Sequence, residues 1–278
     1  MSSPWFIMLV LGLVQGLCEF LPVSSSGHLA LAQALFGLHE PEIVLDLVLH
    51  LGTLFAVIFF YRHSLLALIS ELRYIPKAMT SAENFSLVYR TREDFHLGIL
   101  IIAGSIPTAI IGLFFQDLFS SLFTSVPSIA VALFITGFVL LATNLQKTDS
   151  PKGTLSMTLS QALIIGFVQG LAIAPGLSRS GLTIGAALLL GLNRELSARY
   201  SFLLSIPAII GGLAISLIQG EASSFELKFL LLGFALSAVT GYLALKLLTN
   251  LIDRGHFSIF SIWCFLVGGA SLCWYFSQ

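Results

Sequence analysis

The sequence predicts an all-α integral membrane protein made of two inverted-topology repeats, and three observations favour this fold. Of the 278 residues, 56% are hydrophobic and 10% are charged, whereas about 25% of an ordinary soluble domain is charged. Long stretches without charge divide the chain, and a membrane-spanning helix needs about 20 apolar residues. Two interrupted stretches also resemble each other. This composition excludes a cytosolic enzyme, a disordered chain and a basic nucleic-acid binder.

Each half is predicted to hold a re-entrant, broken helix pair followed by three transmembrane helices, and the two halves form one membrane domain. The uncharged stretches set the approximate bounds. In the first half, 1–150, the broken pair covers 4–36 and the spans cover 43–61, 96–115 and 127–145. In the second half, 151–278, the broken pair covers 156–190 and the spans cover 197–218, 227–248 and 257–276.

Both broken pairs are interrupted by a Pro/Gly/Ser cluster, which reads LPVSSSGH over 21–28 and APGLSRSG over 174–181. Pro and Gly break helices, and the freed backbone is tolerated at membrane depth only inside protein or beside a wet cavity. The two regions match 154 positions apart. Gln-Gly-Leu at 15–17 recurs at 169–171, and Ser24, Ser26 and Gly27 recur as Ser178, Ser180 and Gly181. Paired broken segments of this kind indicate a binding site at the midplane.

The basic residues predict the orientation. Three crossings in each half would invert the second half, and Lys and Arg favour the cytoplasmic side. One set of loops contains all of them except Lys228 and Arg179, which places both termini outside and puts 62–95, 146–155, 191–199 and 246–256 in the cytoplasm. Two full crossings by each broken pair would give the same count, so re-entrance stays open. We expect an interfacial helix and then a polar loop over 62–95, and no cleavable signal peptide, since Arg62 is the first basic residue.

Glu19 is the first candidate functional residue, because an ionisable residue in a membrane segment marks function by default. It lies one helical turn after Gln15 and shortly before Ser24, Ser25 and Ser26. One serine suits an N-cap, and a helix N-terminus also binds phosphate or carboxylate. The alternative for Glu19 is a hydrated residue near the interface.

Histidine and arginine complete the pattern. His28 is either a core histidine or, beside Glu19 and Ser25, a proton shuttle. Arg179 interrupts an apolar stretch, and its planar fork suits phosphate; the alternative is a structural ion pair with Glu19. Further candidates around these residues are Ser178, Ser180 and Thr183 as anion ligands, Gln169 as a support, and Asp46 and His50, which form either a supporting pair or boundary residues. Such a set fits phosphoryl transfer or anion transport.

The segments 15–28 and 175–183 closely resemble the two signature motifs of the bacterial undecaprenyl-diphosphate phosphatase family, also known for bacitracin resistance. The resemblance implies a plasma-membrane enzyme that hydrolyses undecaprenyl diphosphate to the monophosphate and recycles the lipid carrier of peptidoglycan. It implies catalytic roles for Glu19, Ser25, His28 and Arg179, and a diphosphate site that includes Ser24, Ser26 and Gly27.

The resemblance also implies a divalent cation, Mg²⁺ or Ca²⁺. Its expected protein ligand is Glu19 together with Gln15, which stands where many members carry a second carboxylate, so the diphosphate itself would supply most ligands. The expected partners are a long-chain prenyl diphosphate and the bilayer, with homo-oligomers allowed and no nucleic acid. The site is expected to open to the outer face. A transporter or flippase for a lipid phosphate or small anion is the alternative function.

Overall fold

The computed structural model describes residues 3–38, 43–115, 118, 122, 125–145, 153–219 and 225–277. These residues form helices and connecting turns, with no strand among them. The predicted boundary between the halves, at 150 and 151, and most of the predicted loop 146–155 lie outside the described residues.

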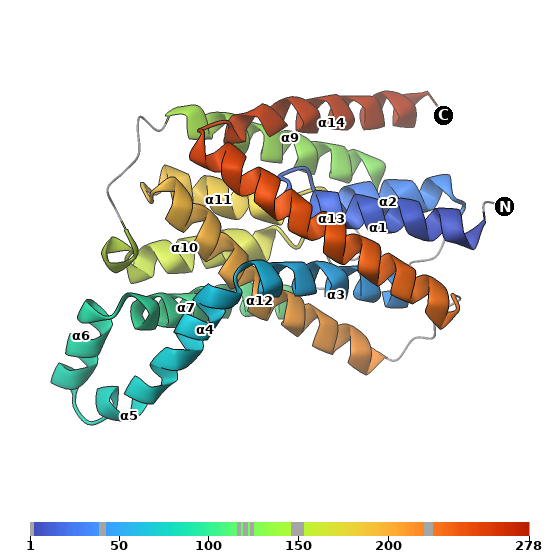
Figure 1. The fold of residues 1–278 in the computed structure, drawn as a ribbon. Coiled ribbons are helices and arrows are strands. Elements are labelled where there is room, and N and C mark those ends of the chain that lie inside the picture. Colours follow the sequence, from blue (N-terminus) through green and yellow to red (C-terminus); the bar gives the residue numbers. More distant parts are fainter. Residues whose placement is uncertain are drawn as a thin grey trace.

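The first half begins with the broken pair and continues through the long helices (Figure 1). Its elements are α1 (Pro4–Phe20), α2 (Ser25–Leu35), α3 (Ile43–Phe60), α4 (Arg62–Glu71), the 3-10 turn η1 (Leu72–Tyr74), α5 (Ile75–Ala78), α6 (Ala82–Thr91), α7 (Glu93–Phe114), α9 (Val126–Ala142) and η2 (Thr143–Leu145).

The second half has the same order of long elements. They are η3 (Thr154–Ser156), α10 (Leu159–Leu171), α11 (Arg179–Leu189), α12 (Arg194–Gln219), α13 (Leu227–Asp253), η4 (Phe257–Ile259) and α14 (Phe260–Phe276). All six predicted spans and both broken pairs are therefore helical, as expected from the uncharged stretches.

The helices define a multi-pass membrane protein. Among the described residues, five helices are long and apolar enough to cross a bilayer, or six if α3 and the bent continuation through α4 and α5 count as one span. Large apolar side chains are at least half exposed along these helices, for example Ile102 of α7, Phe138 of α9 and Leu243 of α13. A row of such side chains would be unfavourable in water and is favourable in lipid.

The breaks within the two pairs have defined backbone geometry. Ser24 lies between α1 and α2 with φ 71°, and Gly176 lies between α10 and α11 with φ 87°. A Cβ added to Gly176 would lie 2.6 Å from the carbonyl oxygen of Ile129 in α9. Position 176 therefore requires glycine, both for its positive φ and because the break lies directly against α9.

Close packing through small residues joins the two halves. Gly12 and Gly16 place α1 against α13, whereas Gly166 and Gly170 place α10 against α7. A Cβ on Gly16 would lie 1.9 Å from Thr240 Oγ1, so no larger residue fits there. Glycines four positions apart allow such close helix contacts in membranes. The α9 and α14 helices also run side by side (Figure 1).

The segment between α3 and α7 corrects one expectation. We expected a helix and then a polar loop, but α4, α5 and α6 make most of this segment helical. The α6 helix forms because Ser81 caps it by accepting a hydrogen bond from the Asn84 N–H. Val88 and Phe95 then pack together in a small apolar cluster with Ala78, which the low hydropathy of the segment concealed. In Figure 1 these helices extend from the end of the bundle opposite both termini.

Candidate active site

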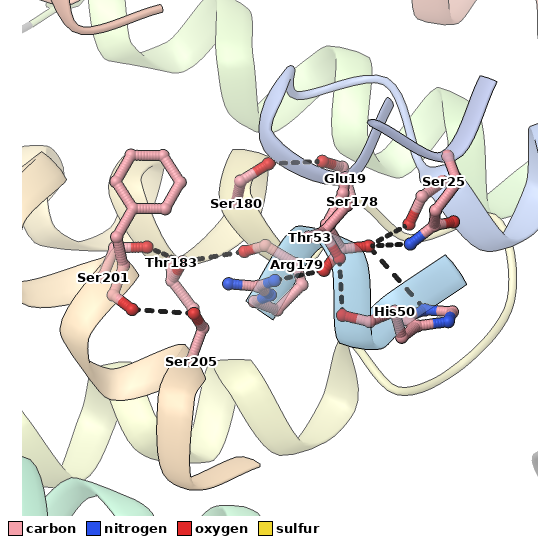
Figure 2. Close-up of polar contacts among 12 residues, drawn as sticks. Glu19, Ser25, His50, Thr53, Ser178, Arg179, Ser180, Thr183, Ser201 and Ser205 are labelled. Carbon is pink, nitrogen blue, oxygen red and sulfur yellow. Dashed lines mark hydrogen bonds and ion pairs between the residues drawn. The ribbon is translucent and has the colours of Figure 1, made fainter. Parts of the chain in front are cut away.

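The carboxylate of Glu19 lies at the centre of the site, in the last turn of α1, and the residue is 8% exposed. Ser25 Oγ donates to Glu19 Oε2 at 2.7 Å, and Gln15 Nε2 donates to the same oxygen at 3.1 Å. Arg179 Nη2 donates to Oε1 and forms an ion pair with the carboxylate. Figure 2 shows Ser25 and Arg179 pointing toward this carboxylate from two helices that are distant in sequence. A buried charge of this kind requires such partners.

The serine clusters cap α2 and α11, the second helix of each broken pair, in the same way. Ser24 Oγ accepts a hydrogen bond from the Gly27 N–H at 3.3 Å, and Ser178 Oγ accepts one from the Gly181 N–H at 3.1 Å. The hydroxyls of Ser24 and Ser26 lie 3.4 Å apart, and those of Ser178 and Ser180 lie 3.3 Å apart. The repeated motif therefore produces two equivalent helix N-termini, and N-termini with their N–H groups favour an anion.

Arg179 combines an ion pair with an unused donor. Its side chain is 15% exposed, and Nη2 is committed to Glu19. Its Nη1 is buried and has no hydrogen-bond partner among the described residues. Since leaving a buried donor unsatisfied is costly, Nη1 is suited to an additional anionic ligand. Both interpretations of Arg179 from the sequence, ion pair and anion ligand, are compatible with this geometry.

His28, one of the predicted catalytic residues, contacts Ser24 and Trp263 and forms no hydrogen bond with Glu19 or Ser25 among the described residues. Its Nδ1 lies 2.9 Å from the carbonyl oxygen of Ser24, and its Nε2 accepts a hydrogen bond of 3.0 Å from Trp263 Nε1. The indole of Trp263, from α14, stacks against the imidazole with ring centroids 6.1 Å apart. Both ring nitrogens are thus used at the break between α1 and α2. The partner from α14 could not be predicted from the spacing of residues within α2.

His50 is the histidine that contacts Glu19. Its Nε2 lies 3.8 Å from Glu19 Oε2, and its Nδ1 lies 2.7 Å from the backbone carbonyl of Asp46. The Asp46 side chain accepts a 2.6 Å hydrogen bond from Gln33 Nε2 of α2. Asp46 thus contacts His50 through its backbone carbonyl, a geometry compatible with the supporting-pair alternative from the sequence.

Two of the remaining predicted residues, Thr183 and Gln169, lie on α11 and α10. Thr183 Oγ1 donates to the Arg179 carbonyl at 2.8 Å and also hydrogen-bonds the Ser201 hydroxyl of α12. Gln169 Nε2 lies 3.3 Å from Thr108 Oγ1 and donates within the α7 and α12 contact, away from any carboxylate. Sequence reasoning missed two hydroxyl residues near the site. Ser201 lies beside Thr183 in Figure 2, and Thr136 accepts a hydrogen bond from the Ser178 N–H at 3.1 Å. A lone hydroxyl in an apolar span forms no sequence pattern that would reveal it.

The oxygen ligands present suit a hard divalent cation. Gln15 Oε1 is buried without a hydrogen-bond partner, and it lies on the same side chain that contacts Glu19. Mg²⁺ and Ca²⁺ prefer such carbonyl and carboxylate oxygens. Within the described part of the chain, no cluster of three or more His, Cys, Asp or Glu could hold a metal ion.

Fold and site together define a multi-pass membrane protein with a buried carboxylate, serine and arginine between two broken helix pairs. Comparison with known proteins then gives the family. Residues 8–270 match the family described as bacitracin resistance protein BacA, and the chain belongs to this family.

Three named relatives match this chain over nearly its whole length. A protein of Desulfatibacillum aliphaticivorans called undecaprenyl-diphosphatase is 44% identical over 270 residues, covering 96% of this chain and 98% of its own. Proteins with the same designation from Desulforapulum autotrophicum and Desulfosudis oleivorans are 42% and 43% identical, and each comparison covers 95% of this chain. The chain covers 95% and 96% of these two relatives.

Proposed function

We propose that this protein is an undecaprenyl-diphosphatase, which hydrolyses undecaprenyl diphosphate to undecaprenyl phosphate and inorganic phosphate. The single observation that carries the proposal is the convergence of Ser25 and Arg179 on the buried Glu19 carboxylate. The designations of the relatives name the same activity. Ser25 offers a nucleophile, Glu19 offers a base, and Arg179 offers an N–H donor without a partner for the phosphate. These groups suit phosphoryl transfer.

The diphosphate binds first, at the two helix N-termini. Arg179 Nη1 and the first-turn N–H groups of α2 and α11 hold the terminal phosphate, whose negative charge their partial positive charges favour. Thr183 and Ser201 support the first turn of α11 by bonding behind Arg179. These donors stabilise the charge that develops on the phosphate oxygens in the transition state.

Ser25 then acts as the nucleophile. Its hydroxyl already donates to Glu19 Oε2 at 2.7 Å, so the carboxylate can accept the proton as the oxygen attacks the terminal phosphorus. The bond between that phosphorus and the bridging oxygen breaks, and undecaprenyl phosphate leaves. Water then attacks the phosphorus of the phosphoserine, the bond to Ser25 Oγ breaks, and the proton held by Glu19 returns to that oxygen as inorganic phosphate leaves.

Gln15 Oε1 and Glu19 are the protein atoms that would hold a divalent cation beside the diphosphate. When bound, such an ion would reduce the negative charge of the phosphates. Mg²⁺ commonly keeps only one or two protein ligands and takes the rest from substrate phosphate and water. Magnesium or calcium therefore fits the donor set.

We further propose that the two halves, 1–150 and 151–278, are inverted repeats in the inner membrane, with the site open to the outer face. Matched geometry supports the repeats: Gly37 follows α2 with φ 74°, and Gly191 follows α11 with φ 84°, 154 positions later. The first helix of each pair packs against a span of the other half: α1 contacts α13, and α10 contacts α7. The distribution of Lys and Arg supports the orientation.

The alternative, a transporter or flippase for a lipid phosphate, shares the repeat but not the asymmetry. Glu19 in the first half corresponds to Ile173 in the second. A transporter that exposes one site alternately to the two sides of the membrane does not need a carboxylate base in one half alone. A catalytic site does need such a base.

The experiment is release of inorganic phosphate from undecaprenyl diphosphate by the protein purified in detergent with magnesium. We expect turnover by the native chain and a loss of about 10²- to 10³-fold in Arg179→Lys, since lysine keeps the charge but not the fork. Arg62→Lys, on α4 away from the site, is the matched control and should retain activity. A well-folded native protein that releases no phosphate would overturn the proposal and favour the transporter.

A further inference from the structure

We propose that His50 is a positioning residue for the Glu19 carboxylate, an inference that rests on the proposed phosphatase function. The sequence pointed to His28 as the imidazole of the site, yet His28 is bound by Ser24 and Trp263. His50 lies in α3 with Nε2 3.8 Å from Glu19 Oε2, the oxygen that also accepts from Ser25 (Figure 2).

The ring of His50 is oriented by a backbone group. A carbonyl oxygen can only accept, so Nδ1, which lies 2.7 Å from the Asp46 carbonyl, carries a hydrogen and donates it. This bond directs Nε2 toward Glu19, and Nε2 can donate to the carboxylate only when the ring carries a hydrogen on both nitrogens. Ring orientation set by the opposite nitrogen is how histidines are commonly prepared for a role in a site.

Three helices are joined in a closed set of contacts around the carboxylate. Ser25 connects α2 to Glu19 of α1 at 2.7 Å. Gln33, two turns further along α2, donates to Asp46 Oδ1 of α3 at 2.6 Å, and His50 leads back to Glu19. Polar contacts therefore join α1, α2 and α3 in pairs, and two of the three end at Glu19 Oε2.

The second half of the chain provides an internal comparison. Its second helix, α11, has the same serine cap as α2, and a glycine with positive φ follows it in the same way. It has Ile173 in place of Glu19 and Ala187 in place of Gln33, and α12 contains neither histidine nor aspartate. The caps and breaks thus form without this polar set. Its presence in the first half alone indicates that it serves Glu19 and not the fold.

The role of His50 follows from the effect of bound substrate on the ion pair between Arg179 and Glu19. A phosphate bound to Nη1 shares the guanidinium with Glu19 and so weakens its attraction for Glu19 Oε1. His50 contacts the other oxygen and remains in place when phosphate binds, so Oε2 stays directed at Ser25 Oγ. Misplacing a base by about 1 Å can cost 10²-fold in rate. His50 should therefore affect the chemical step and not the binding of diphosphate.

The test compares His50→Leu, His50→Gln and the control His63→Leu, an exposed histidine of α4. Leucine has similar volume but no donor, and we expect kcat to fall about 10- to 100-fold with KM nearly unchanged. Glutamine keeps an N–H donor at similar reach and should recover most of the loss. Binding of a non-hydrolysable prenyl methylene-diphosphonate should be equal in all variants. If His50→Leu does not fold, His50→Asn replaces it, because asparagine is too short to reach Oε2.

The outcomes separate the two proposals. Native-like kcat in the His50→Leu protein, or equal losses in the Leu and Gln variants, would overturn the role of His50 while leaving the phosphatase intact. Weakened binding of the diphosphonate in parallel with kcat would also overturn it, because it would place His50 in substrate binding. Absence of phosphate release by the native chain would instead overturn the proposed function.

Discussion

Ser25 and Arg179 are the first residues of α2 and α11, 154 positions apart, and their side chains donate to the two oxygens of one carboxylate, that of Glu19. Equivalent positions in the two halves thus carry different chemistry, a hydroxyl in one and a guanidinium in the other. The N-terminus of each helix brings its own N–H groups to the same place. In the proposed reaction, these two N-termini hold the anion, and the side chains that differ between the halves supply the reacting groups.

Ser25 should carry the phosphoryl group during turnover. Brief reaction with prenyl diphosphate labelled in the terminal phosphate, followed by an acid quench, should leave phosphoserine at position 25 of the native protein. Ser25→Ala should lose the label and at least about 10³-fold in rate, since nucleophile removal is among the largest single effects in enzymes. Ser128→Ala, on α9, should behave as the native protein. Near-normal turnover of Ser25→Ala would show that water attacks directly.

Gln15 should set the requirement for metal. Chelation should abolish phosphate release, and added Mg²⁺ should restore it. Gln15→Ala removes the unpaired Oε1 beside Glu19, so the Mg²⁺ concentration for half-maximal rate should rise about tenfold or more. Gln169→Ala, at the equivalent position, contacts Thr108 and not a carboxylate, and should leave the metal requirement unchanged. Equal metal dependence of the native and Gln15→Ala proteins would exclude Gln15 as a ligand.

Gly166 should tolerate no side chain. An added Cβ would lie 1.9 Å from the Gly104 carbonyl oxygen, and Thr108 Oγ1 donates to the Gly166 carbonyl at 2.7 Å in the same contact. Gly166→Ala should therefore destabilise the protein by about 1–3 kcal/mol through overpacking of α7 against α10. Thermal unfolding in detergent measures this effect. Gly211→Ala, with nothing within 4 Å of the added Cβ, should be neutral or stabilising, and a similar loss there would contradict the packing argument.

The helices between α3 and α7 should loosen in acid. Arg92 Nε and Nη2 donate to the Glu71 carboxylate at 2.5 and 2.7 Å, and these hydrogen bonds lower the pKa of Glu71 below its ordinary value. A group whose pKa is lower in the folded state stabilises it above the ordinary pKa and loses that contribution as pH falls through the lowered value. Amide exchange in α4 and α6 should therefore rise, relative to the bundle, below about pH 4.

Arg92→Ala tests the cause of this acid response. Without the guanidinium, which also lies 3.7 Å above the Tyr74 ring, exchange in α4 and α6 should already be faster at neutral pH and should change less in acid. Arg90→Ala, an exposed neighbour, is the control and should keep the native pH profile. An unchanged acid response in the Arg92→Ala protein would assign it to groups other than Glu71.

The sequence by itself determined the spans and breaks of this protein, and it pointed to three residues that the structure brings into contact. Uncharged lengths and Pro/Gly/Ser clusters are local properties of the chain, so the spans and both breaks could be predicted within a few residues. Glu19 and Arg179 could be predicted because a charge in an apolar segment is costly without a function, whereas Ser25 was singled out by the family resemblance. The helical segment 75–91 was missed, since its apolar cluster forms only when α5, α6 and α7 meet.

Only the tertiary structure decided which imidazole faces Glu19. His28 is near Glu19 in sequence, but α2 turns it toward Trp263 of α14. His50 lies 31 positions from Glu19 in the chain and contacts it because α3 packs beside α1 and because the Asp46 carbonyl orients the ring. The physical reason is that residue spacing fixes the direction of a side chain around its own helix axis, whereas the rotation of one helix against another is fixed by the packing and polar contacts between them.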